Sequence, residues 1–459
     1  MTLGALHEDS VVARCVRASL VCRFLTDADG IPACPLKRSV VVRMFASVPA
    51  LQRLLSVLAV VVGTAGVVAG DSVLTLLAVV FLLGLHRPVW TLALTPALLI
   101  WGPKLNLAVM GDEAFFFRLD QAAIAGMLVA AAIRNREAPV SPPAHAALLL
   151  FLMALPLSVV AGVGQGTLET GASAVLYLGQ WLTWYALLLA ASTFGHALGG
   201  RAVYAWALPL IALAAYGLTE SLWPLYAESG VRYRIFERGY FPGQANHVGG
   251  LLALATVTGL ALARERRFRV LGFVLALGAT AALPATGSRS GMVAWTAGIA
   301  AWLLLRRPAL RWWLPPLGVA AFFALPPSLG YRLSAPGSSM YDRLVAWKSA
   351  LSTLPDYPLL GLGAGARHRS YYDSQYLMTL AESGAVGLVL LLCFLVLLAV
   401  ALNRSRALGQ SPLAAGATAG VVVLAVHGLA TASLVVTLVG GPFFWLCGVA
   451  GSATEEARS

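Results

Sequence analysis

The sequence predicts an all-α protein: a polytopic bundle of about 12–14 transmembrane helices, with a large extracytoplasmic loop that contains an amphipathic helix. Three observations predict this class. Hydrophobic residues make up 59% of the 459 residues, and charged residues make up only 11%. Soluble proteins carry about 25% charged residues, so this chain has too few charges to cover a water-facing surface. The mean hydropathy of +0.79 also excludes a soluble, fibrous or disordered protein.

Residues 1–50 are predicted to form a cytoplasmic extension that is disordered. Residues 1–43 are polar and basic, and Arg23 interrupts the apolar stretch 18–25. The segment therefore lacks the unbroken apolar core of a cleavable signal peptide. Met44 offers an alternative start of the chain.

The remaining chain divides into spans and loops. We assign residues 51–326 to a transmembrane bundle with an extracytoplasmic loop at 219–246, residues 327–376 to the large extracytoplasmic loop, and residues 377–459 to C-terminal spans and a short tail. Several apolar runs are shorter than the ~17 residues that cross a bilayer, so the first two and the last two can be tight hairpins or half-spans. The runs are 54–70, 72–86, 88–102, 119–134, 144–163, 174–195, 202–222, 247–264, 269–285, 290–305, 312–326, 383–403, 413–430 and 433–450.

Lysine and arginine in the short loops predict the orientation, because such loops stay on the cytoplasmic side of a membrane. Every second connection between spans carries lysine or arginine, so these connections are predicted to be cytoplasmic, together with both termini. The long loops between them, which mix polar and apolar residues, are predicted to be extracytoplasmic. No basic run is interleaved with aromatic residues, so the net charge of +12 does not indicate nucleic-acid binding. The connecting arginines are Arg87, Arg134, Arg136, Arg201, Arg264, Arg266, Arg267, Arg269, Arg306, Arg307, Arg311, Arg404 and Arg406.

The loop at 219–246 concentrates charged residues, including Arg234 and Arg238, before Gly-Tyr-Phe-Pro-Gly-Gln-Ala-Asn-His at 239–247 enters a span. The planar guanidinium fork of arginine suits bidentate binding of phosphate. A solvated or lipid-headgroup position is the alternative for each arginine. Asn246 can equally serve as a helix N-cap.

A short turn, Thr-Gly-Ser-Arg-Ser-Gly at 286–291, joins two spans. Small residues on both sides of Arg289 let a ligand approach the backbone closely, and the N-terminus of the following helix adds partial positive charge. Arg289 is therefore a candidate for phosphate binding. The alternative is an ordinary tight turn with an interfacial arginine.

The largest loop contains a predicted amphipathic helix at 341–354, which includes Arg343. We expect this helix to lie along the membrane surface or to cap the cavity below it. Its apolar residues at helical spacing are Leu344, Trp347, Leu351 and Leu354.

A glycine-rich segment at 361–365 follows this helix. It lacks the strand-then-helix setting of a nucleotide fold, so we do not predict nucleotide binding. We expect Glu382, inside the next span, to pair with an arginine. The ionisable residues between the glycines and that span are Arg367, His368, Arg369 and Asp373.

These blocks resemble a known family. Arg343 with Trp347, Gly-Leu-Gly at 361–363, and Asp-Ser-Gln-Tyr-Leu-Met-Thr-Leu-Ala-Glu-Ser-Gly-Ala-Val-Gly at 373–387 resemble the signature region of the bacterial O-antigen ligase and polymerase family. The turn at 288–291 and the entry into a span at 239–246 resemble its other recurring blocks. The remaining spans match only in number and layout.

The resemblance implies a multi-span glycosyl transfer enzyme of the bacterial cytoplasmic (inner) membrane, with its active face outside the cytoplasm. Polymerases of this family join polyprenyl-diphosphate-linked repeat units, whereas its ligases pass glycan to the lipid A core. Ligases typically carry His where this sequence has Asp373, so we favour a polymerase of exopolysaccharide, capsule or O-antigen. The implied partners are a polyprenyl-diphosphate-linked glycan donor, a glycan acceptor, membrane lipids and other polysaccharide assembly proteins.

Transfer from a sugar diphosphate lipid requires cations that stabilise the charge developing on the departing diphosphate. The outer loops supply these cations as arginines. We place Arg238 and Arg289 first and Arg343 next, with Arg234 and Arg369 as further candidates for diphosphate binding.

The reaction also requires a base for the proton of the acceptor hydroxyl. Asp373 is the first candidate; partial desolvation would raise its pKa and Arg369 would lower it. His368 is the second candidate, because imidazole titrates near neutrality. The alternative for Asp373 is a helix N-cap. No cluster of His and carboxylate residues has the spacing of metal ligands, so we predict metal-independent transfer without a cofactor.

Two other classes compete with this interpretation. A lipid-linked glycan transporter would place ionisable groups at the bilayer midplane within broken helices. Here Asp71, Asp120 and Glu220 lie near span ends. A structural subunit would have little need for arginines gathered in three outer loops. The histidines His145, His196 and His427 are isolated, and we expect them to be packing residues.

Overall fold

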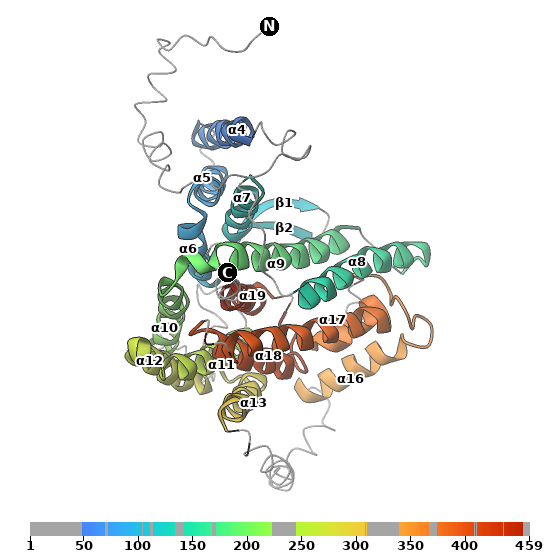
Figure 1. Cartoon of the computed structure of the whole chain (residues 1–459). Helices are drawn as coiled ribbons and strands as arrows, with labels where there is room; N and C mark the ends of the chain where they lie inside the picture. The colour runs from blue at the N-terminus through green and yellow to red at the C-terminus, as the bar shows by residue number, and fades with distance from the viewer. Residues whose placement is uncertain are drawn as a thin grey trace, which may run out of the picture.

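The computed structural model describes residues 48–68, 72–102, 104–110, 113–133, 142–167, 171–222, 245–307, 309, 339–366, 374–407, 409, 411–434 and 436–452. Helices dominate this part of the chain (Figure 1), so the predicted all-α membrane bundle is confirmed. The helices are α4 (Val48–Val68), α5 (Ser72–His86), α6 (Pro88–Trp101), α7 (Leu119–Ile133), α8 (Pro142–Gly164), α9 (Gly171–Leu198), α10 (Arg201–Leu222), α11 (Ala245–Leu262), α12 (Arg269–Ala282), α13 (Arg289–Arg306), α16 (Ser339–Ser352), α17 (Gln375–Ala407), α18 (Ala414–His427) and α19 (Thr437–Ser452), with 3₁₀ helices η1 (Arg266–Phe268) and η2 (Pro284–Thr286).

The observed helices follow the predicted spans, because a chain in hydrocarbon satisfies its backbone polar groups within helices. Among the described residues, six helical segments are long and apolar enough to cross a membrane: α8, α9, α10, α11, the segment 266–286 that contains α12, and α17. Shorter apolar helices accompany them: α4, α5, α6, α7, α18 and α19. Residues 1–47 of the extension predicted at 1–50, and the predicted span at 312–326, lie outside the described residues, whereas residues 48–50 belong to α4.

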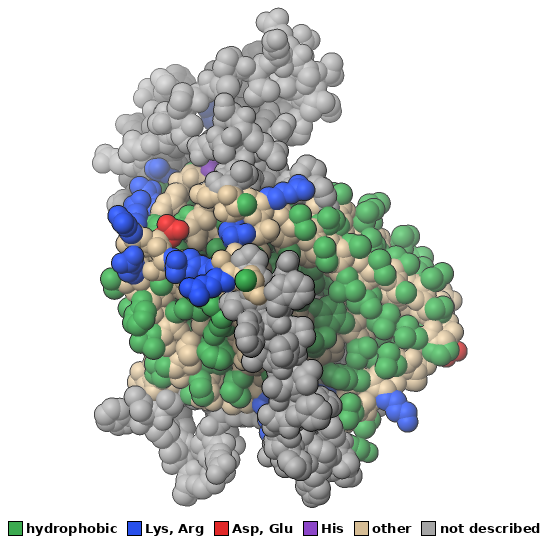
Figure 2. Space-filling model, turned by 60° about the horizontal axis from the view of Figure 1, so that its bottom comes forward, with side chains coloured by type: hydrophobic (Ala, Val, Ile, Leu, Met, Phe, Trp, Pro, Cys, Tyr) green, Lys and Arg blue, Asp and Glu red, His purple; other side chains and the backbone are tan. Residues whose placement is uncertain are grey.

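Apolar side chains cover much of the face of the bundle that Figure 2 shows. In α12, Val270, Phe273 and Leu277 are 77%, 60% and 58% exposed, and their spacing places them on one face of the helix. The other face, which includes Leu275 and Ala279, is buried, and α12 packs against α10 and α11. Such stripes on a helix surface are suited to contact with lipid tails rather than with water.

The core of the bundle is rich in aromatic side chains. In Figure 1 α9, α19, α17 and α18 cross the molecule in neighbouring layers, and α19 packs against both α9 and α6. Trp206 of α10 stacks on Trp445 of α19 with 5.9 Å between ring centroids. The indole nitrogen of Trp445 donates a hydrogen bond to the backbone oxygen of Leu92 in α6 (2.9 Å), so one side chain joins three helices.

One β-hairpin was not predicted. The sequence indicated only a mixed loop between residues 102 and 119, but β1 (Lys104–Met110) and β2 (Glu113–Arg118) pair antiparallel there. The two segments contain Leu-Asn-Leu-Ala-Val and Phe-Phe-Phe, with Met-Gly-Asp between them. Aliphatic and aromatic residues of this kind favour strands, and glycine with aspartate favours a tight turn.

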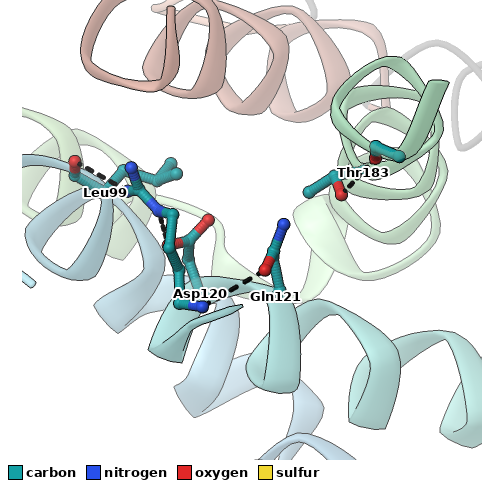
Figure 3. Close-up of polar contacts among 6 residues, drawn as sticks. Leu99, Asp120, Gln121 and Thr183 are labelled. Atoms are coloured by element: carbon teal, nitrogen blue, oxygen red, sulfur yellow. Dashed lines mark hydrogen bonds and ion pairs between the residues drawn. The ribbon is translucent and has the colours of Figure 1, made fainter. Parts of the chain in front are cut away.

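A buried ion pair anchors the end of this hairpin to α7. Arg118 Nε lies 2.6 Å from Asp120 Oδ1, and both side chains are almost completely buried. The Arg118 guanidinium also donates to the backbone oxygen of Leu99 in α6 (3.4 Å). Figure 3 shows Asp120 and Gln121 at the start of α7, close to Leu99, with Thr183 of α9 on the other side. Asp120 therefore lies at the end of its span, as the sequence predicted.

Helix α17 begins at Gln375 rather than near 383, and it is broken at Gly384. Gly384 has φ 64° and ψ −168°, which essentially only glycine adopts. The glycine-rich segment after α16 fills the break and satisfies the freed backbone groups. The hydrogen bonds are Leu362 N to Ala381 O (2.8 Å), Gly363 N to Glu382 O (3.0 Å) and Ala385 N to Pro358 O (2.9 Å).

A helix, α16, lies where the sequence predicted the amphipathic helix at 341–354, and a small residue makes its closest buried contact. Ala350 is 1% exposed and packs with Ala381 of α17. Leu344 and Leu351 are 38% and 49% exposed. A small residue thus sets the close contact with α17, and these leucines remain available to lipid. The glycine-rich segment and Ala350 together fix α16 relative to α17.

Candidate functional site

The end of α18 is a meeting point for three segments that carry predicted site residues. We refer to residues 427–434 as the His427 loop. The His427 ring contacts the first turn of α11 and the turn at 286–291. The backbone oxygen of Gly428 accepts a hydrogen bond from the backbone nitrogen of Gln375, where α17 begins (2.8 Å). The start of α11, the turn at 286–291 and the start of α17 therefore meet at the His427 loop. Each of these segments contains or adjoins predicted phosphate-binding or base residues.

His427 is fully buried, and both of its ring nitrogens have partners. Nε2 lies 3.0 Å from the backbone oxygen of Asn246. Because a carbonyl oxygen can only accept, we assign the hydrogen to Nε2. Nδ1 lies 2.5 Å from Ser433 Oγ, and in the neutral ring it accepts the hydroxyl hydrogen. Asn246 is the second residue of α11, so the N-cap role that the sequence left open for it is wrong.

The turn at 286–291 faces inward with its serines and outward with its arginine. Ser288 caps α13, since its Oγ accepts a hydrogen bond from Gly291 N (3.0 Å). Ser290 is buried, and its Oγ lies 3.4 Å from His427 Nε2 and 3.5 Å from Thr431 Oγ1. Arg289 is the first residue of α13 and is exposed. Arg289 is therefore held at the surface, while the serines on either side of it are buried and hydrogen bonded.

The start of α17 is attached to the His427 loop through Ser374 and Gln375. Ser374 Oγ lies 3.3 Å from Gly428 O and 3.5 Å from the backbone nitrogen of Leu377. This serine holds the N-cap position of α17 that the sequence also left open for Asp373. Gln375 Oε1 accepts a hydrogen bond from Leu434 N (3.1 Å). Residue 374, directly after Asp373 in the chain, is therefore fixed from two sides.

Two further cationic or titratable residues lie near the His427 ring. Arg343 of α16 is half-buried, and His247 lies in the first turn of α11. Both interact electrostatically with His427. Helix α16 therefore brings its arginine to the same end of the bundle as Arg289.

The predicted site residues divide into two groups. Arg289 and Arg343 are described, and the structure brings both to the neighbourhood of the His427 loop. The others lie outside the described residues: Asp373, His368, Arg234, Arg238 and Arg369.

Three helices begin around the His427 loop, namely α11, α13 and α17. The N-terminus of a helix carries about half a positive charge, because its first backbone N–H groups have no partner within the helix. Anions bind at such ends. Together with Arg289 and Arg343, these helix ends make this region electropositive and suited to a phosphate-bearing ligand.

Arginines gather at the far ends of the same helices. Helix α11 has 18 residues, so its two ends lie ~27 Å apart, which is close to the thickness of a bilayer core. Figure 2 shows a cluster of Lys and Arg side chains at one end of the molecule. The residues that follow or end α11, α13 and α17 there are Arg264, Arg266, Arg267, Arg269, Arg306, Arg307, Arg404 and Arg406.

A buried carboxyl group lies near the break in α17. Glu382 is 2% exposed, and its carboxyl group lies near the buried hydroxyl of Tyr177 in α9. The expected pairing of Glu382 with an arginine stays a prediction.

His427 is the residue that the sequence analysis missed. The sequence indicated an isolated packing histidine, whereas the structure gives its ring hydrogen-bond partners from α11 and the His427 loop. The only local signal is the run Gly-Leu-Ala-Thr-Ala-Ser that follows it, which interrupts the apolar pattern with two hydroxyl residues. That signal does not reveal the partner segments.

The chain was compared with known protein families. Residues 271–392 match the family model described as O-antigen ligase. The matched region runs from α12 to the middle of α17 and includes the turn at 286–291, α16 and the glycine-rich segment. No curated protein matches the chain.

Proposed function

Because residues 271–392 match the family model described as O-antigen ligase, we propose that the chain is a member of the O-antigen ligase and polymerase family and polymerises polyprenyl-diphosphate-linked oligosaccharide repeat units into a surface polysaccharide. The product class is an exopolysaccharide, a capsule or an O-antigen. The enzyme is of the glycosyltransferase type and works without a metal ion. Its partners are the lipid-linked donor, a glycan acceptor and the surrounding lipids.

One observation carries this proposal: three helix N-termini and two predicted arginines meet around the His427 loop. The ligand that such a site favours carries concentrated negative charge. A diphosphate fits this description, and Arg289 at a helix N-terminus can contact it through the guanidinium fork as well as through nearby backbone N–H groups.

The proposed reaction needs one base and no separate acid. The acceptor hydroxyl oxygen attacks the anomeric carbon of the donor, and the bond from that carbon to the diphosphate oxygen breaks with its electron pair. The hydroxyl proton passes to the carboxylate of Asp373, with His368 as the alternative base. Arg238, Arg289 and Arg343 stabilise the charge that develops on the diphosphate, and Arg234 and Arg369 assist them.

The charge distribution supports an extracytoplasmic site in the cytoplasmic membrane. Helices α11, α13 and α17 run from the His427 loop to ends rich in arginine. Short connections rich in Lys and Arg remain in the cytoplasm. The His427 loop then faces the outside, and the orientation with both termini in the cytoplasm follows from the same rule.

A ligase that passes glycan to the lipid A core is the second candidate, because the family match carries the ligase name. Asp373 stands where ligases of the family typically have His, and this favours the polymerase. A lipid-linked glycan transporter is the third candidate, and it would bind the same diphosphate without breaking it.

Purified protein in nanodiscs, supplied only with lipid-linked repeat units, tests the proposal. We expect products of two or more repeat units to appear on gels without any other protein. Absence of elongation would contradict a polymerase, and transfer to added lipid A core alone would identify a ligase. In a deletion strain the polymerase predicts single-repeat products at the cell surface, whereas the ligase predicts intact polymer that stays on its lipid carrier.

A further inference from the structure

His427 is hydrogen bonded to, or lies close to, segments of the chain that carry predicted substrate-binding residues. Its Nε2 is hydrogen bonded to the backbone of α11 at Asn246 (3.0 Å) and lies 3.4 Å from Ser290, the neighbour of Arg289. Its Nδ1 is hydrogen bonded to the hydroxyl of Ser433 in the His427 loop. A purely apolar residue could fill the same volume, but it could not make these bonds.

The position of Arg289 depends on how its turn is held. Ser288 and Ser290 face the interior, and their hydroxyl oxygens lie 3.3 Å apart. Ser290 also lies 3.5 Å from Thr431 in the His427 loop. Loss of the imidazole would remove one polar partner each from the Asn246 carbonyl and the Ser290 and Ser433 hydroxyls, and these buried groups would shift to replace it. The guanidinium of Arg289 would move with its turn.

We propose that His427 is a positioning residue that holds the Arg289 turn against the first turn of α11 through its Nε2–H group. This inference rests on the proposed function and adds a residue to it. His427 acts on the reaction only through Arg289. A displacement of about 1 Å at a catalytic group can lower the rate about 100-fold, so a small shift of the turn is sufficient for a large effect.

Three substitutions separate the hydrogen bond from the volume of the side chain. His427→Gln can place an amide N–H near the position of Nε2. His427→Asn can place its amide only near the position of Nδ1, and His427→Leu fills space without any polar group. We expect the kcat for elongation to fall about 10- to 100-fold in the Leu and Asn variants and to recover to within about threefold of wild type in the Gln variant. The KM for the lipid-linked donor should change less than the kcat.

A double-mutant cycle with Arg289→Lys tests whether His427 acts through Arg289. Lysine keeps the charge but not the planar fork, so measurable activity is expected to remain. If His427 only positions Arg289, adding His427→Leu to Arg289→Lys should lower the kcat much less than it does in the wild-type background. Independent, multiplied losses in the double variant would overturn the proposal.

The matched control is His145→Leu. His145 lies near the start of α8 and its ring lies 3.0 Å from the hydroxyl of Tyr185, so it is a partly buried histidine with a polar partner. We expect the kcat of the His145→Leu variant to stay within about twofold of wild type. This result would show that the loss in the His427 variants is specific to His427 and is not the effect of removing any histidine from the helices.

The outcomes distinguish this inference from the proposed function. A wild-type protein that never elongates lipid-linked units contradicts the function itself. An active wild type with equal losses in the Gln, Asn and Leu variants contradicts only the positioning role. Should His427→Leu fail to fold, the comparison of Gln with Asn, both polar and amide-bearing, decides: equal kcat values overturn the proposal.

Discussion

Gly250 of α11 lies directly against the ring of His427. A Cβ atom placed on Gly250 would lie 2.6 Å from Cε1 of the imidazole, well inside van der Waals contact. The ring cannot move away without breaking its bonds to Asn246 or Ser433, because it is buried and held from both sides. The glycine is therefore required for the close approach of α18 to α11.

The variant Gly250→Ala should displace the imidazole and loosen both helices. We expect a loss of unfolding free energy of about 1–3 kcal/mol, the usual result of overpacking a filled core. Elongation activity should fall as well, since the Arg289 turn moves with the ring. Thermal unfolding in detergent and the elongation assay measure the two effects.

The control for this variant is Gly278→Ala in α12. A Cβ there would meet only Ala214 Cβ at 3.6 Å, an ordinary contact. Alanine also favours a helix over glycine by about 1 kcal/mol. Equal or higher stability is expected, and a Gly250→Ala protein as stable and active as this control would show that the close contact is unimportant.

The variant Gly384→Ala should disrupt the break in α17. Its backbone conformation is essentially restricted to glycine, and a Cβ atom would lie 2.2 Å from the backbone oxygen of Leu359. We expect the glycine-rich segment to be expelled and α16 to lose its position, so that activity falls at least about 10-fold. Limited proteolysis of the 353–366 segment would detect the release.

Gly164→Ala, at the end of α8, is the matched control for the break, because nothing lies within 4 Å of a Cβ placed there. Its protease pattern should match that of wild type. If Gly384→Ala also keeps the wild-type pattern and full activity, the break in α17 does not fix α16.

The helices were predictable from sequence because each span depends on residues that are close neighbours in the chain. The run 72–86 coincides with α5, and 88–102 agrees with α6 to within one residue. The ends of such runs are set by local Pro, Gly and charged residues, so covalent order is sufficient to find them. The hairpin at 104–118 was missed because the apolar pattern there was interpreted as part of a mixed loop.

The site was predictable only in part. Arg289 and Arg343 stand in recognisable local motifs, so they could be singled out from sequence. His427 acquires its significance from contacts with Ser290 and Asn246, which lie 137 and 181 positions away in the chain. Apolar periodicity carries no information on pairing across such distances, and one sequence alone gives no other source for it.

Removal of divalent metal ions should leave elongation unchanged. We propose that arginines and helix N-termini supply the positive charge that a metal would otherwise provide. Activity after exhaustive treatment with EDTA should stay within about twofold of the untreated protein. Strict recovery by added magnesium, measured in the same nanodisc assay, would contradict this prediction and would indicate that a cation bridges the diphosphate to the protein.

Arg289→Ala should abolish elongation while the protein still folds and inserts. Arg289 is exposed, and the hydrogen bonds of its turn come from Ser288 and Ser290, so its side chain can be removed without opening the core. Loss of a cation that stabilises a leaving diphosphate is expected to lower the kcat about 100- to 1,000-fold. Arg289→Lys should retain part of the activity because it keeps the charge.

Arg269→Ala is the matched control, because Arg269 also begins a helix, is also exposed, and lies at the arginine-rich end of the bundle. Since this end is ~27 Å from the His427 loop along α11, its charge should not reach the diphosphate. Elongation by Arg269→Ala should match wild type. Equal losses in the Arg269 and Arg289 variants would mean that total basic charge, and not the arginine at the His427 loop, governs the reaction.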